Sequence, residues 1–177
     1  MEVNDDDVSP ASIIPKNLIT WSDIKKPSNV IIEDQKTVKY PTGGSFRWVR
    51  SNEEFTEGYH NFNVKFDTYE GLTELPTHVS FGISWEPNLS CDSNTFYFSN
   101  AQVYCNYYPT VTHNYNQLFN TPPKCKLGDT LGVTIDFNNK EVEFFINYDS
   151  IFKTPLMSEG SPVYIVGALF IGSLQIV

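Results

Sequence analysis

Residues 128–147 read GDTLGVTIDFNNKEVEFFIN. Apolar and polar residues alternate in each half of this stretch, and the polar run at residues 138–140 separates the halves. Because successive side chains of a β-strand point to opposite faces, this pattern predicts a β-hairpin with one apolar face. That face would carry Leu131, Val133, Ile135, Phe137, Val142, Phe144 and Ile146.

Short runs of β-prone residues continue on both sides of the hairpin, separated by turns rich in Pro, Gly and Asn. No stretch holds a long apolar stripe with the period of a helix. Many short strands at a spacing of about ten residues predict an all-β sandwich or barrel. We expect strands at residues 30–32, 37–40, 47–50, 59–68, 78–84, 95–98, 101–104, 130–137, 141–146, 163–169 and 174–177.

Size and charge limit the classes of function. A chain of 177 residues suits one domain with a substantial core. Its formal net charge of −9 repels the phosphates of nucleic acids and anionic lipid surfaces. We therefore expect a partner that is neither nucleic acid nor membrane.

The first residues differ in composition from the rest. Residues 1–19 include an acidic Asp5-Asp6-Asp7 run and two prolines, which predicts a disordered tail before a sandwich over residues 20–177. This segment lacks the apolar core of a signal peptide, and no apolar run reaches the ~20 residues of a membrane span. The three cysteines have no CxxC spacing, which favours reduced thiols. We therefore expect a cytoplasmic protein, with free thiols at Cys91, Cys105 and Cys125.

Several patches together resemble the SPRY (B30.2-like) domain family. They are GYHNFNV at residues 58–64, VSFGIS at 79–84, GDTLG at 128–132 and the hairpin that follows. The resemblance runs from about Trp21 to Val177. It implies an all-β fold, a bent antiparallel β-sandwich of concanavalin-like type, and an adaptor that binds partner proteins without catalysis, cofactor or metal.

Some positions depart from the family pattern and mark a divergent member. Asn61-Phe62-Asn63 replaces a Tyr-Trp-Glu run, Lys140 stands where the hairpin turn usually has glycine, and Tyr148 replaces the glycine after Asn147. At Lys140 we expect either a different turn geometry or a strained backbone.

The resemblance also implies a ligand groove made by loops at one end of the sandwich. The groove would bind a protein or peptide segment, and the chain would act as a monomer. The family's peptide-contacting arginine has no match near Tyr40-Pro41. Loops rich in Tyr, Asn and Trp, at residues 85–88, 104–109, 113–116 and 147–149, suit such recognition. The positions that match the family's groove are Tyr40, Pro41, Thr42, Trp85, Tyr104, Phe170, Ile171 and Gly172.

Two alternatives remain. Glu141 and Glu143 share one face of a strand, about 6.6 Å apart at ~3.3 Å per residue, and paired carboxylates on a sandwich are typical of glycosidases. This favours a carbohydrate-binding, lectin-like sandwich or a glycosidase relative, whereas the simpler interpretation is a solvated outer face. The chain is alternatively a scaffold domain of a larger protein. His60, His78 and His113 have no metal-ligand spacing, so no metal site is expected.

Overall fold

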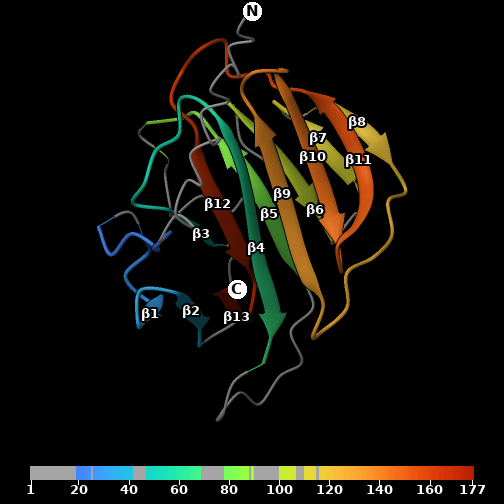
Figure 1. Ribbon diagram of the computed structural model, residues 1–177. Helices are drawn as coiled ribbons and strands as arrows, with labels where there is room; N and C mark the ends of the chain where they lie inside the picture. The colour runs from blue at the N-terminus through green and yellow to red at the C-terminus, as the bar shows by residue number, and fades with distance from the viewer. Residues whose placement is uncertain are drawn as a thin grey trace, which may run out of the picture.

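The computed structural model describes residues 19–24, 26–41, 47–68, 78–87, 89, 100–106, 110–114 and 116–177. Within these ranges the chain forms two antiparallel sheets that pack face to face, and it contains no helix (Figure 1). The predicted all-β sandwich is therefore confirmed. None of the described residues belongs to a helix with the length and hydropathy needed to cross a membrane.

The larger sheet has seven strands among the described residues, in the order β1-β2-β13-β4-β9-β10-β11. All neighbouring pairs are antiparallel. The predicted hairpin forms β9 and β10, with Asp136 opposite Glu141 and Leu131 opposite Ile146. The strands are β1 (Ile31–Glu33), β2 (Thr37–Tyr40), β4 (Tyr59–Asp67), β9 (Thr130–Asp136), β10 (Glu141–Ile146), β11 (Asp149–Pro155) and β13 (Gly172–Ile176).

The second sheet has six described strands in the order β3-β12-β5-β6-β7-β8, again antiparallel throughout. The sequence did not predict two strands of this sheet, β7 and β8, and it did not predict β11 of the larger sheet. The expected strand at 95–98 and the expected tail up to residue 18 lie outside the described residues. The strands of this sheet are β3 (Arg47–Arg50), β5 (Val79–Ser84), β6 (Ala101–Cys105), β7 (Thr110–His113), β8 (Asn116–Asn120) and β12 (Tyr164–Leu169).

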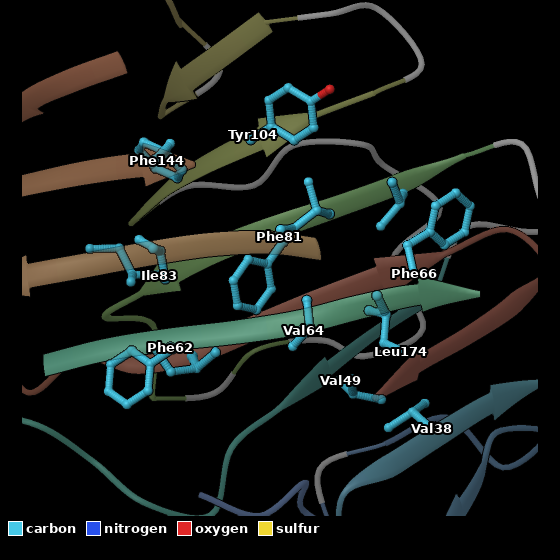
Figure 2. Close-up of a cluster of buried hydrophobic side chains, with 14 of the residues drawn as sticks. Val38, Val49, Phe62, Val64, Phe66, Phe81, Ile83, Tyr104, Phe144 and Leu174 are labelled. Carbon is cyan, nitrogen blue, oxygen red and sulfur yellow. The ribbon is translucent and has the colours of Figure 1, made fainter. Parts of the chain in front are cut away.

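The alternating residues of the strands fill the space between the sheets with one large apolar core. Phe62, Val64 and Phe66 of β4 enter this core from the larger sheet, and Phe81 and Ile83 of β5 enter it from the smaller sheet (Figure 2). The apolar face of the predicted hairpin is buried here as well, except for Phe137, which is only partly buried. Burial of a large apolar side chain stabilises a fold by ~1.5–3 kcal/mol, so this core is the main source of stability.

The smaller sheet also buries part of its outer face. Trp48 and Val166 lie in a second, smaller apolar cluster with Leu89, and Phe170 packs against it. Trp48 and Val49 are adjacent on β3 and belong to different clusters, as the alternation of side chains along a strand requires. Both faces of this sheet are therefore apolar near β3 and β12.

Aromatic stacking closes one open side of the sandwich. The edge strands β8 and β11 each carry a β-bulge, and Phe119 of β8 stacks on Phe152 of β11 at 5.0 Å between ring centroids. Bulges bend an edge strand and interrupt its row of free backbone groups. The two edges therefore pack against each other across the sandwich.

The two positions that lack the family's glycine have a left-handed backbone. Lys140 has φ +54°, and Asn147 and Tyr148 have φ +51° and +69°. Two positive φ values in a two-residue loop define a type I′ turn, which here joins Ile146 of β10 to Asp149 of β11. Of the two alternatives expected at Lys140, the structure shows the strained backbone. A left-handed backbone costs a residue with a side chain ~1–2 kcal/mol.

Candidate functional site

The sandwich has two ends, where different sets of turns join the strands. One end, here called the Phe170 end, carries Pro41, Arg47, His78, Phe170 and Ile171, and it is the lower end in Figure 1, where β4 ends and β9 begins. Arg47 lies opposite Leu169, the residue before Phe170, in the pairing of β3 with β12.

The opposite end, here called the Trp85 end, carries Trp85, Asn100, His113 and Tyr164. β12 pairs with β5 along its whole length, from Tyr164 opposite Ser84 to Leu169 opposite Val79. Five steps of ~3.3 Å along these strands place the two ends about 17 Å apart. A short peptide segment held at one end therefore does not reach the side chains of the other.

At the Phe170 end, several of the residues named from the sequence come together. Tyr40 of β2 lies directly opposite Gly172 of β13. The backbone N–H of Phe170 donates to the carbonyl oxygen of His78 at 3.2 Å, and the two rings lie 5.8 Å apart. The turn between β12 and β13 is thus fixed to the start of β5.

These residues differ in how much surface they offer. Tyr40, Ile171 and Gly172 are buried, so they shape the framework of this end. Pro41 is exposed and Phe170 is partly exposed. Pro41 and Phe170 therefore supply accessible surface at this end, while Thr42 lies outside the described residues.

Tyr104 lies inside the protein. Its side chain is 2% exposed, and its hydroxyl oxygen lies 2.8 Å from the carbonyl oxygen of Pro123 and 3.0 Å from Oδ1 of Asn106. The same hydroxyl accepts the backbone N–H of Cys125 at 3.0 Å. Burial raises the pKa of Tyr104 far above its ordinary value and that of Cys125 to about 12, so both stay protonated at neutral pH.

Replacing Tyr104 with phenylalanine is expected to lower the free energy of unfolding by about 1–3 kcal/mol. The variant keeps the ring but leaves the buried N–H of Cys125 without its acceptor. Urea unfolding of the variant beside wild type measures this cost. An unchanged midpoint would mean that the hydroxyl does not hold residues 121–126 in place.

Trp85 lies at the other end of β5, away from Pro41 and Phe170. Its backbone N–H donates to the carbonyl oxygen of Asn100 at 2.8 Å, and its ring lies 5.7 Å from that of His113. Burial lowers the pKa of His113, which favours the neutral imidazole. The structure therefore does not bring Trp85 together with the other residues named for the groove.

Sequence reasoning missed two residues of the Phe170 end, Arg47 and His78. The family's arginine is expected near Tyr40-Pro41, whereas Arg47 reaches this end because β3 pairs with the last residues of β12. The sequence places His78 at the start of an expected strand, and there it is considered as a metal ligand but not as part of the groove. The signal for both is their position at the start of an expected strand.

The carboxylates considered for glycosidase chemistry have partners on the neighbouring strand. Glu141 forms an ion pair with Lys153 at 2.6 Å, and Glu143 accepts a hydrogen bond from the hydroxyl of Ser150. The hydrogen bond with Glu141 raises the pKa of Lys153. Glu141 and Lys153 border a wide, shallow hollow of about 520 Å³ with Asn139, Lys140, Thr154 and Pro155. In the described ranges, no three His, Cys, Asp or Glu side chains come together as a metal site.

Comparison with solved structures shows which fold this is. The crystal structure of the SPRY domain of human HERC1 superposes with a TM-score of 0.70 at 14% sequence identity, covering 88% of this chain and 96% of that one. The TRIM65 PSpry domain gives a TM-score of 0.67 at 15% identity, covering 90% and 91%. No family model and no curated protein matches the sequence. The chain therefore has the fold of SPRY domains, as the sequence resemblance implied, with a strongly divergent sequence.

Proposed function

We propose that this chain is a protein-interaction module that binds a short segment of a partner protein at the Phe170 end. It acts without catalysis, as a cytoplasmic adaptor and as a monomer. The proposal rests on the SPRY fold and, above all, on Phe170, a partly exposed aromatic residue on a turn that is fixed by backbone hydrogen bonding.

The surroundings of Phe170 suit recognition of a peptide. Pro41 supplies exposed apolar surface, and the imidazole of His78 and the residue Arg47 lie at the same end. Aromatic and arginine side chains contribute most to binding free energy at protein interfaces. Because the framework beneath them is buried and strand-paired, little conformational entropy is lost on binding.

Replacement of Phe170 with aspartate tests the proposal. Peptides are first selected on the wild-type protein from a random-peptide display library, and their affinities are then measured by fluorescence anisotropy. We expect the variant to bind at least 10-fold more weakly, because a charge replaces the apolar anchor.

Tyr59→Ala is the matched control, because Tyr59 is 59% exposed and lies at the Trp85 end, opposite Asp136. It is expected to bind like wild type, and unfolding curves show that both variants are folded. A folded Phe170→Asp variant with wild-type affinity would refute the proposal, as would a library that yields no binding peptide.

The glycosidase alternative predicts instead that the protein hydrolyses a glycan and that Glu141 is needed for this activity. We propose that the ion pair of Glu141 with Lys153 and the hydrogen bond of Glu143 stabilise the pairing of β10 with β11. A glycan array and a hydrolysis assay are expected to be negative. Hydrolysis that is lost in Glu141→Gln would favour an enzyme instead.

A further inference from the structure

The turn between β10 and β11 exposes a tyrosine in a backbone conformation that favours glycine. Tyr148 is 70% exposed with φ +69°. A bulky residue at such a position is uncommon, and left-handed residues with side chains cluster at ligand-binding sites. The turn itself would form more easily with glycine at this position, so the side chain of Tyr148 is not needed for the turn.

A second turn is fixed to this one by the side chains of Asn147 and Asp129. Asn147 donates to the carboxylate of Asp129 at 2.8 Å and accepts the backbone N–H of Thr130 at 2.9 Å. The other oxygen of the same carboxylate accepts the backbone N–H of Lys126 at 2.6 Å. The two turns are held together through one carboxylate, which orders the backbone beneath Tyr148.

The second turn adds apolar surface and an exposed lysine. Leu127 is 40% exposed, and Gly128 follows it with φ +89°, which completes a tight turn closed by the N–H of Asp129 on the carbonyl of Lys126. Lys124 and Lys126 are both exposed. Lys126 thus places an ammonium group next to the exposed Leu127, in a turn that also holds Asp129.

Both turns lie at the Phe170 end. β10 ends and β9 begins there, beside the end of β4, and β13 begins there as well. β13 and β10 are three places apart in the sheet, about 14 Å at ~4.8 Å per strand. An extended segment of about five residues covers that distance.

We propose that Tyr148, Leu127 and Lys126 form a second contact site for the partner segment, which takes an apolar side chain next to a carboxylate. This rests on the proposed function and extends it from the turn at Phe170 to the turn at Tyr148. The apolar side chain packs on Tyr148 and Leu127, and the carboxylate pairs with Lys126.

Tyr148→Gly separates binding from folding. Glycine relieves the left-handed backbone, so the urea midpoint of the variant is expected to rise, while its affinity for the peptides selected on wild type falls at least 10-fold. A more stable variant that binds more weakly cannot owe its loss to unfolding. Tyr59→Ala again serves as the exposed-tyrosine control.

Lys126→Glu tests the charge. We expect selected peptides to carry an acidic residue beside an apolar one, and the variant to bind them several-fold more weakly at low salt, with a smaller difference at 0.5 M NaCl because salt screens exposed charges. Wild-type affinity of Tyr148→Gly together with a loss in Phe170→Asp would overturn this inference alone. Wild-type affinity of both variants would overturn the proposed function as well. A wild-type dimer that Tyr148→Gly converts to a monomer would assign the surface to a second copy of the chain.

Discussion

Replacing Trp21 with alanine is expected to lower the free energy of unfolding by about 3–5 kcal/mol, the usual cost of removing a large buried aromatic side chain. The indole is 1% exposed and lies in the main core. Its six-membered ring packs against Gly167 of β12, where the absence of a side chain leaves room for it.

The same residue also fixes the first described segment to both sheets. Its indole N–H donates to the carbonyl oxygen of Lys36 at 2.9 Å, and its backbone N–H donates to Gln35 at 2.8 Å, next to β2. On the other side it forms a β-bridge with Ser51, just after β3. Loss of the ring removes core packing at a point where the two sheets are joined.

Urea unfolding followed by fluorescence measures this cost, with Ile24→Ala as the control. Ile24 lies three residues away but is almost fully exposed, so its replacement is expected to change stability by less than about 0.5 kcal/mol. Equal effects of the two variants would show that residues 19–24 do not pack as the structure has them.

Replacing Gly82 with alanine is expected to destabilise the protein by about 3 kcal/mol or more, at the upper end of overpacking effects. A Cβ atom at this position would lie 2.3 Å from the carbonyl oxygen of Gln102 and 2.8 Å from the Cα of Val103. Both atoms belong to the backbone of β6, which cannot move without disrupting its pairing with β5 and β7.

Ser80→Ala is the matched control for Gly82→Ala. Ser80 lies two residues away on the same strand, is fully buried, and its hydroxyl has no hydrogen-bond partner in the described structure. Its removal is therefore expected to be neutral or slightly stabilising. If thermal unfolding gave the same melting temperature for Gly82→Ala and wild type, the close approach of β5 and β6 would be wrong.

Clean alternation of side chains made three of the strands the easiest to predict. β4, β9 and β10 have this pattern because one face of each lies on the core. β8 and β11 are edge strands with many exposed residues, and each carries a bulge that breaks the alternation, so their sequences resemble loops.

The candidate site was harder to predict for a different reason. The resemblance placed Tyr40, Phe170 and Ile171 at one end, and the structure brings them there, but it puts Trp85 at the other end and Tyr104 inside the core. The sequence shows that His78 and Trp85 flank one strand. It does not show which of these two flanking residues lies near a turn that is distant in the sequence, such as the turn at Phe170. The position of Arg47 at the Phe170 end follows from the pairing of β3 with β12, which the sequence does not show.

The most direct test of binding at the Phe170 end is a two-dimensional NMR titration of the ¹⁵N-labelled protein with a peptide selected on it. We expect shifted amides at residues 40, 170–172, 126–130 and 147–149, all at the Phe170 end. Amides near Trp85, Asn100 and His113 are expected to stay unchanged. Shifts confined to the Trp85 end, with none around Phe170, would contradict the proposed binding surface.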